Sequence, residues 1–176
     1  ARPAHDVSRA IRDPWTRRVV GAAWMEEDSK QHFFDADLQR AYEAAAGQFS
    51  TGHVELLSWS RDRSRVLLYA ERSLDGGGYY VFTPATATMR ALGMLYPEKS
   101  GARPSVRQSV NYRARDGARI PAYLTMPTGE NRGLPLVVLV HGGPHSRDTM
   151  GFDWWSAFLV SRGYAVLQPN FRGSTG

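Results

Sequence analysis

At 176 residues, 42% of them hydrophobic and 11% aromatic, the sequence can bury one sizeable core or parts of two, and no apolar run is long enough to span a membrane. The formal charge of +5 comes almost entirely from scattered arginines, because only Lys30 and Lys99 are lysines among the 22 basic residues, and this pattern argues against nucleic-acid binding. The absence of cysteine excludes disulfides, thiolate metal sites and a cysteine nucleophile.

The N-terminal segment is predicted to be a loop. Residues 1–17 are polar, are interrupted by Pro3 and Pro14, and lack the apolar core of a signal peptide, which favours a cytoplasmic over a periplasmic location. The chain begins without Met, so this N-terminus need not be the natural one. A first strand is predicted over Arg18–Trp24.

A short amphipathic helix is predicted to begin after Asp35, which can cap its first turn, and to end near Gly47 to Phe49. Its apolar residues recur at helical spacing, namely Leu38, Tyr42, Ala45 and Phe49. We interpret this face as core packing.

Four short apolar runs follow within residues 53–95, and turn-forming residues separate them: HVELLSWS, RVLLYAE, GYYVFT and TMRALGML. Four strands with tight turns predict one antiparallel module, and a unit of about 40 to 50 residues with four strands is typical of a β-propeller blade. A propeller needs about four to eight blades, so residues 18–95 hold at most one complete blade and part of another. An isolated four-stranded meander is the alternative.

A domain boundary is predicted in the charged, turn-rich segment Glu98–Pro104. A hairpin follows, in which Asp116 and Gly117 form the turn between VRQSVNYRA and ARIPAYLTMP. Pro127 and Gly129 are expected to end its second strand.

The stretch Leu134–His145, LPLVVLVHGGPH, is the clearest functional signal in the chain. Its unbroken apolar run predicts a strand that is buried on both faces of a parallel sheet. The glycines then mark a sharp exit from the strand. Because they have no side chain, Gly142 and Gly143 allow backbone amides to approach a reacting group, as an oxyanion hole requires.

A helix is predicted over Asp153–Gly163, with Asp153 as its cap and Gly163 at its end. Its apolar side is expected to consist of Trp154, Phe158 and Leu159. The run Tyr164–Gln168 then predicts a second buried strand. Strand, helix and strand together form a βαβ unit, in which the two strands should be parallel and the crossover right-handed.

These motifs resemble the prolyl oligopeptidase family of serine peptidases, particularly its acylaminoacyl-peptidase and dipeptidyl-peptidase-like branches. The RDG hairpin, the strand into HGGP, the helix ending in SRGYAV and the segment PNFRGSTG occur in the order of that family. Upstream, SWSRDRSRVLLYAE and GGYYVF are similar to its last propeller blade. The resemblance covers about residues 18–176.

The resemblance implies a fold that is incomplete in this chain, with one or more β-propeller blades followed by the N-terminal part of an α/β-hydrolase fold, whose sheet is mixed and mostly parallel. Residues 1–104 would be the C-terminal part of the propeller domain. Residues 105–176 would be the N-terminal part of the hydrolase, or peptidase, domain.

The resemblance also implies hydrolysis of peptide bonds by a Ser, Asp, His triad through an acyl-enzyme, without a metal or other cofactor. The backbone amide of Gly143 would be one oxyanion-hole donor, and Gly142 would serve the loop geometry. No serine has glycines at both positions of a G-x-S-x-G elbow, and Ser50 and Ser174 each have one at the wrong offset. We therefore expect the triad to lie outside this chain, and the chain alone to be inactive.

The histidines and carboxylates do not supply a second site by spacing. We expect His141 and His145 to shape the loop around the glycines by hydrogen bonding. The other histidines have no partners at metal-ligand spacing, and these are His5, His32 and His53. Asp148 and Asp153 are interpreted as a loop anchor or a helix cap.

Arg172 follows the second predicted parallel strand, where active-site loops gather in open α/β sheets. It can bind a substrate carboxylate or brace its loop through an ion pair, and we favour bracing while keeping Arg172 as a substrate-binding candidate.

The expected partners are a peptide substrate and either the remainder of the hydrolase domain or another chain, which would cover the edge of the LPLVVLV strand. We expect no nucleic-acid or membrane partner. Two alternatives stay open: an esterase or other acyl hydrolase of the same fold, because HGG-type loops are widely shared, and a non-catalytic binding module.

Overall fold

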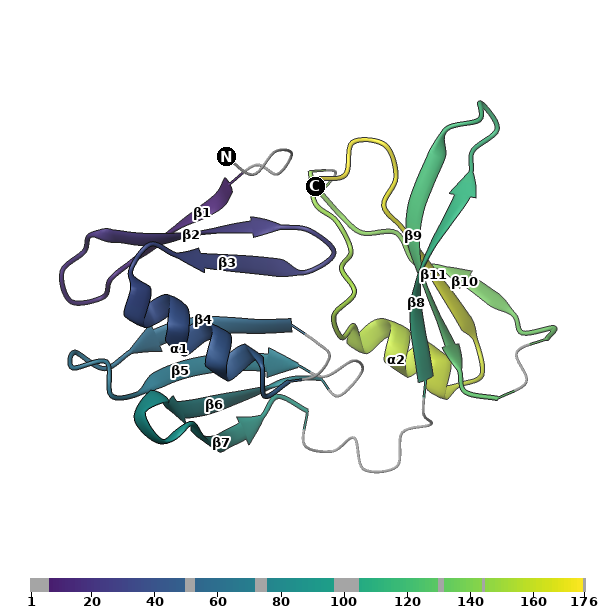
Figure 1. Ribbon diagram of the computed structural model, residues 1–176. Coiled ribbons are helices and arrows are strands. Elements are labelled where there is room, and N and C mark those ends of the chain that lie inside the picture. The colour runs from purple at the N-terminus through teal and green to yellow at the C-terminus, as the bar shows by residue number, and fades with distance from the viewer. Residues whose placement is uncertain are drawn as a thin grey trace. The chain divides into compact units, whose positions relative to one another are not determined.

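The chain forms two compact units, Ala1–Pro97 and Glu98–Gly176 (Figure 1). The computed structural model describes residues 7–49, 53–71, 76–96, 105–129, 132–143 and 145–175. The segment Glu98–Pro104, in which the sequence predicts a domain boundary, lies outside the described residues, as do His5 and Ser50.

The first unit begins with a three-stranded antiparallel sheet in the order β1-β2-β3. Its strands are β1 (Val7–Arg12), β2 (Val19–Met25) and β3 (Ser29–Phe33). The strand expected from Arg18 is confirmed as β2, but the prediction that residues 1–17 form a loop is wrong over β1. This strand pairs along the edge of the sheet and buries only Ile11, so backbone pairing with β2 defines it rather than an apolar pattern.

The predicted helix is confirmed as α1 (Ala36–Ala46). The Asp35 carboxylate accepts hydrogen bonds from the backbone amides of Asp37 and Leu38 at 3.0 and 3.2 Å, which satisfies two of the free amides of the first turn. Gly47 caps the other end. The helix buries Leu38, Ala41 and Ala45.

The four predicted strands are also confirmed, and they form an antiparallel sheet in sequence order. They are β4 (His53–Trp59), β5 (Val66–Glu71), β6 (Gly78–Thr83) and β7 (Thr88–Met94), with the short 3-10 helix η1 (Pro84–Thr86) between the last two.

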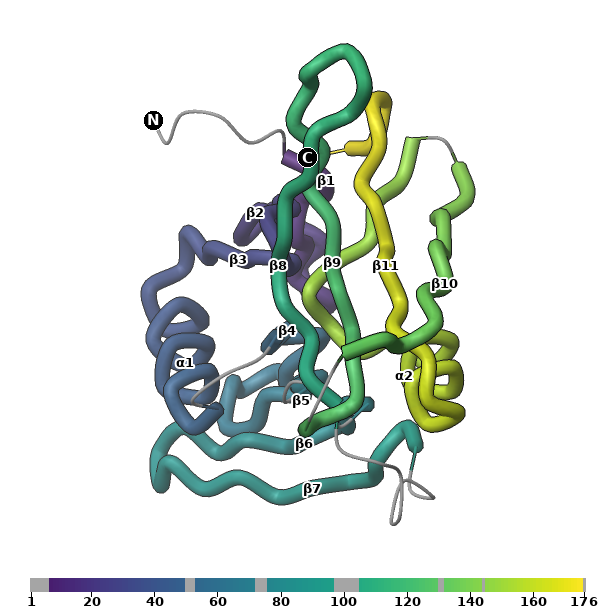
Figure 2. Tube along the Cα trace, turned by 90° about the vertical axis from the view of Figure 1, so that its right-hand side faces the viewer, coloured from purple at the N-terminus to yellow at the C-terminus, as the bar shows by residue number. Residues whose placement is uncertain are grey.

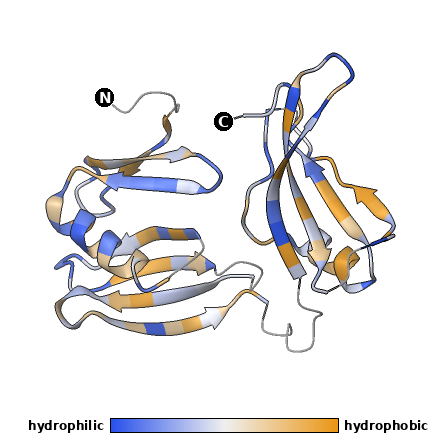
Figure 3. Ribbon diagram, turned by 45° about the vertical axis from the view of Figure 1, so that its right-hand side comes forward, coloured by the Kyte–Doolittle hydropathy of each residue, from blue (hydrophilic) through white to orange (hydrophobic). Residues whose placement is uncertain are grey.

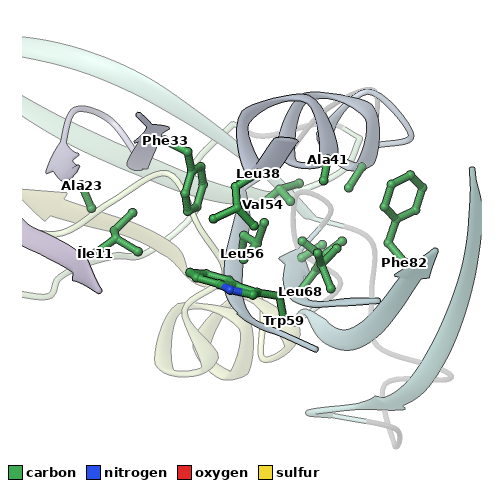
Figure 4. Packing of buried hydrophobic residues seen from close by; sticks show 13 residues of the cluster. Ile11, Ala23, Phe33, Leu38, Ala41, Val54, Leu56, Trp59, Leu68 and Phe82 are labelled. Carbon is green, nitrogen blue, oxygen red and sulfur yellow. The ribbon is translucent and has the colours of Figure 1, made fainter. Parts of the chain in front are cut away.

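One cluster of buried apolar side chains joins both sheets and α1 (Figure 4). Phe33 packs edge-on against Trp59, with ring centroids 6.2 Å apart. Between the sheets, the buried Gln31 side chain of β3 donates to the Leu56 carbonyl and accepts from the Leu56 amide at 3.1 and 2.7 Å. The two sheets of the first unit are therefore parts of one folded body.

The second unit is a four-stranded sheet in the order β10-β11-β9-β8 (Figure 2). Its strands are β8 (Ser105–Arg113), β9 (Arg119–Pro127), β10 (Leu136–Val138) and β11 (Ala165–Pro169). The predicted hairpin is confirmed as β8 and β9, and Gly117 has the positive φ of 86° that its turn requires.

The strand pairings of this sheet confirm one expectation and correct another. The strand Leu136–Val138 is parallel to β11, as the βαβ pattern predicted. The description of the sheet as mostly parallel is wrong for the described strands, because β11 pairs with β9, and β9 with β8, in antiparallel fashion. The hairpin, which comes before the βαβ unit in the sequence, supplies these antiparallel strands.

The helix between the parallel strands is α2 (Trp154–Ser161), and it packs on β9 and β11. Its predicted cap is confirmed, since Asp153 accepts a hydrogen bond from the Ser156 amide at 2.7 Å. The apolar side expected at Trp154, Phe158 and Leu159 is not the buried face, because α2 buries Ser156 and Val160 and leaves three large residues about half exposed: Trp154, Trp155 and Phe158. The hydroxyl of Ser156 faces a buried polar side chain, which a large apolar residue would not satisfy.

The apolar strand β10 lies at the edge of the sheet, so the expectation that it is buried on both faces is not met in this chain. Two of its apolar residues, Leu136 and Val138, are more than half exposed, and so is Val140 just after it. Figure 3 shows this apolar strand and the apolar helix α2 in the second unit.

An open strand edge with exposed apolar side chains is a template for pairing with another strand. We predict that residues 1–176, expressed alone, self-associate through this surface, as size-exclusion chromatography with light scattering would show. Val138→Lys, which places a charge on the edge, should reduce the association. A monodisperse wild-type monomer with a cooperative melt would contradict this prediction.

Candidate functional site

The loops that follow β10 and β11 meet at one edge of the second unit, as expected for the carboxyl ends of neighbouring parallel strands. The Thr175 amide donates to the Ser146 carbonyl at 2.9 Å. The Asn170 side chain accepts from the Asp148 amide at 2.8 Å and donates to the Asp148 carbonyl at 3.1 Å. We call the segment between β10 and α2, which contains Gly142 and Gly143, the glycine-containing loop. It is therefore held by the segment after β11.

The backbone of Gly143 has a conformation that favours glycine. Its φ is +140°, and a Cβ atom placed on it would lie 2.9 Å from the His145 amide nitrogen and 3.1 Å from Ser146. A Cβ on Gly142 would have no atom of the described residues within 4 Å. The local packing therefore requires glycine at position 143 and not at position 142.

His141 lies between these two loops. Its ring stacks on Phe171, with centroids 4.4 Å apart and an angle of 14° between the planes. Its Nδ1 atom lies 2.9 Å from the Gly142 carbonyl oxygen, and its Nε2 atom lies 2.8 Å from Ser174 Oγ. These contacts agree with the loop-shaping interpretation of His141, whereas the His145 side chain is exposed.

Beneath the loops, the buried amide of Gln168 joins three elements. Its Oε1 atom accepts hydrogen bonds from Arg107 Nη1 on β8 and from Ser156 Oγ on α2, each at 2.7 Å. Its Nε2 atom donates to Asp148 Oδ1 in the glycine-containing loop at 3.0 Å. Each polar atom of the amide thus has a partner inside the unit.

The guanidinium of Arg107 has further contacts in the same interior. It donates to Thr125 Oγ1 at 3.2 Å and to the Thr149 carbonyl at 2.6 Å, and it lies over the Tyr123 ring at 5.1 Å. The bond to Thr149 fixes a second point of the glycine-containing loop.

The carboxylate of Asp148 has a partner in this network for only one of its two oxygens. Its Oδ2 atom is buried and has no hydrogen-bond partner among the described residues. Burial, and less strongly repulsion from Asp153, raises the pKa of Asp148, although His141, Arg107 and the Gln168 hydrogen bond act in the opposite direction. The interpretation of Asp148 as a loop anchor agrees with these contacts.

Arg172 forms an ion pair with Asp116 in the β8–β9 turn. The hydrogen bond from Arg172, together with the Ala118 amide, holds the pKa of Asp116 below its ordinary value. The bracing contact that we favoured for Arg172 is therefore present. Arg172 also lines a pocket of about 230 Å³ beside the loops, together with Arg119, Arg147, Asn170, Phe171 and Ser174.

Several residues of this site were missed in the sequence, namely Arg107, Gln168, Phe171 and Ser174. One of them had a usable signal. Gln168 ends the apolar run YAVLQ, which is predicted to be a buried strand. A polar residue inside a buried strand indicates an internal partner.

Within the described residues, no group of three or more His, Asp or Glu side chains could hold a metal ion. None of the helices in that part of the chain is long and apolar enough to cross a membrane.

We predict that Gln168→Leu destabilises the second unit by about 2 kcal/mol or more, because it removes an acceptor from Arg107 and Ser156 and a donor to Asp148 in the interior. Urea unfolding, or hydrogen exchange of the β9 and β11 amides, measures the change. The matched control is Gln108→Leu at an exposed position of β8, which should change stability by less than about 0.5 kcal/mol. Equal effects of the two substitutions would contradict the role of Gln168.

No protein-family model matches the sequence. Individual proteins nevertheless match this chain along most of its length. It is 34% identical to dipeptidyl aminopeptidase BIII of Pseudoxanthomonas mexicana, covering 97% of this chain and 26% of that protein. It is 28% identical to the acylamino-acid-releasing enzyme of Sus scrofa, covering 84% of this chain and 22% of that enzyme. The chain thus spans about a quarter of the length of these relatives.

Solved structures agree in fold. The Pyrococcus horikoshii acylaminoacyl peptidase superposes with a TM-score of 0.64 at 19% identity, covering 99% of this chain and 26% of that one. These neighbours combine a propeller with an α/β-hydrolase domain. The homologues and structural neighbours of this chain are therefore peptidases of the prolyl oligopeptidase family.

Proposed function

We propose that this chain is part of a serine peptidase of the prolyl oligopeptidase family. Residues 1–104 would form the C-terminal part of its propeller domain, and residues 105–176 the N-terminal part of its α/β-hydrolase domain. The observation that carries the proposal is the 34% identity to a dipeptidyl aminopeptidase over 97% of the chain, because it extends through both units. The four-stranded meander β4–β7 and the parallel pair β10–β11 with α2 between them support it.

The substrate is a peptide, and the reaction proceeds through an acyl-enzyme on a serine supplied by polypeptide beyond these residues. In this reaction the Gly143 amide donates to the oxyanion of the tetrahedral intermediate, and the conformation of Gly143 supports this role. One such donor contributes about 3 to 4 kcal/mol of transition-state stabilisation. That contribution assists a nucleophile but does not replace one.

Two further assignments belong to this proposal. Arg172 is a substrate-binding candidate, because it lines a pocket with Arg119 and Arg147, and three guanidinium groups favour a carboxylate. The remainder of the hydrolase domain, or another chain, covers the exposed edge of β10, because an open strand edge with apolar side chains is a template for pairing.

The complete gene product should hydrolyse chromogenic aminoacyl or peptidyl substrates, and changing its elbow serine to alanine should abolish turnover. Residues 1–176 alone should neither turn over these substrates nor react with a serine-reactive phosphonate. Equal rates for the complete protein and its serine variant would refute the peptidase assignment. The ratio of peptide to ester turnover decides between a peptidase and an acyl hydrolase of the same fold.

Gly143→Ala in the complete protein should lower kcat by at least about tenfold, toward the ~10²- to 10³-fold loss that follows removal of an oxyanion donor. The added Cβ would lie 2.9 Å from the His145 amide nitrogen and would force the loop to move. Gly142→Ala is the matched comparison and should have the smaller effect, since its Cβ meets open space among the described residues. Equal losses in the two variants would count against the assignment of Gly143.

A further inference from the structure

The contacts of His141 determine which of its ring nitrogens carries the proton. Nδ1 lies 2.9 Å from the Gly142 carbonyl oxygen, and a carbonyl oxygen only accepts. The neutral ring must therefore be protonated at Nδ1. Nε2 is then an acceptor, and the Ser174 hydroxyl at 2.8 Å is its donor. The Gly142 carbonyl thus sets the tautomer, and the Ser174 hydroxyl completes its hydrogen bonds by donating to Nε2.

This carbonyl belongs to the same planar peptide group as the N–H of Gly143. In a trans peptide the C=O and N–H bonds point in opposite directions, so a ring that holds the carbonyl also sets the direction of the amide. The Gly143 amide is the oxyanion donor of the proposed function. The hydrogen bond from His141 therefore acts on the peptide group that the reaction would use.

The plane of the imidazole is set by the segment that follows β11. Phe171 stacks on the ring, and the Ser174 amide donates to the Phe171 carbonyl at 3.0 Å, which places the hydroxyl beside the same ring. The next residue along the chain, Thr175, donates its amide to the Ser146 carbonyl at 2.9 Å. The segment that contains Ser174 is thus attached to the glycine-containing loop on both sides of Gly143.

We propose that Ser174 is a positioning residue, which holds the Nδ1–H tautomer of His141 by donating to Nε2 and thereby orients the Gly142–Gly143 peptide group toward the oxyanion. This inference rests on the proposed function for its catalytic consequence, but not for the tautomer itself. Ser174 and His141 also resemble a nucleophile and its base by distance. A hydrogen bond from the Ser174 hydroxyl to Nε2 of His141 is expected both for a positioning residue and for a nucleophile with its base. The experiment therefore has to separate positioning from nucleophilic attack.

Kinetics of the complete gene product form the first test. Ser174→Ala should lower kcat about three- to tenfold with KM within about twofold, the change expected from one lost hydrogen bond, and Ser174→Thr should restore it. The matched control is Ser161→Ala, which removes an exposed hydroxyl at the end of α2 and should leave kcat unchanged. Wild-type kcat in Ser174→Ala, or an equal loss in Ser161→Ala, would overturn the inference.

Two substitutions of His141 separate hydrogen bonding from packing. Asparagine places its amide nitrogen near the position of Nδ1 and can still donate to Gly142, whereas glutamine reaches toward the position of Nε2. We expect His141→Asn to retain more kcat than His141→Gln, which should lose about tenfold or more. A residue that only packs against Phe171 would not distinguish the two, so equal rates would refute the positioning role.

The tautomer is tested without any activity measurement. In the complete gene product labelled with ¹⁵N-histidine, the ring signals lost in His141→Asn belong to His141, and they should show a protonated Nδ1 and an unprotonated Nε2. Ser174→Ala should shift the Nε2 signal. A neutral ring protonated at Nε2, or labelling of Ser174 by a serine-reactive phosphonate, would overturn the inference. Absent turnover in the wild type would instead refute the proposed function and leave the NMR result to decide on the tautomer.

Discussion

The side-chain amide of Gln168 is the point on which the second unit depends, because it is buried and satisfies polar groups of three other elements at once. A buried polar atom without a partner costs about 1 to 3 kcal/mol, so the amide can be accommodated only in the orientation that pairs both of its ends. That requirement fixes Arg107 of β8, Ser156 of α2 and Asp148 of the glycine-containing loop relative to β11. The loop after β10 therefore cannot shift without breaking contacts in the interior.

This anchoring matters for an oxyanion site, because hydrogen-bond donors stabilise developing charge only when they are already oriented. The glycine-containing loop is held from below by Asp148 and from the side by the segment after β11, through Ser146 and His141. Gly143 lies between these attachments in a conformation that favours glycine. The flexibility that glycine brings to an unfolded chain is thus removed here by contacts outside the glycine itself.

Sequence patterns predicted the elements whose signals are local. The cap of α1 at Asp35, the four strands β4–β7 and the Asp116-Gly117 hairpin each depend on residues a few positions apart, and each is confirmed. Strands β1 and β3 were missed because they are short and largely polar, and pairing with β2 defines them.

The buried network could not be predicted in the same way. It joins Arg107 and Gln168, which are 61 positions apart, and neither residue indicates its partner. The face of α2 follows from this network. Helical spacing indicated an apolar side at Trp154, Phe158 and Leu159, whereas the hydrogen bond from Ser156 to Gln168 places Ser156 in the interior. The sequence therefore located the glycine-containing loop but not the contacts that hold it.

The same constraint explains why the second unit has polar groups inside and apolar groups outside. With Ser156 turned toward Gln168, the large side chains of α2 face outward. There the ring centroids of Trp154 and Trp155 lie 5.1 Å apart, and the Cζ atom of Arg162 lies 5.4 Å from the centroid of the Phe158 ring. The edge strand β10 adds Leu136 and Val138 to the exposed apolar surface. In a larger α/β domain, further strands and helices bury such surfaces.

The geometry of the loop and the stability of the unit consequently have different sources. Hydrogen bonds that close within residues 105–175 set the geometry, whereas burial of the apolar surface depends on whatever polypeptide covers it. A covering segment would add stability in proportion to the apolar area it buries, at about 25 cal/mol per Å², without having to reorganise the polar contacts beneath. Under the proposed function, this part of the chain would form the oxyanion side of the site, and further polypeptide would contribute the cover and the nucleophile.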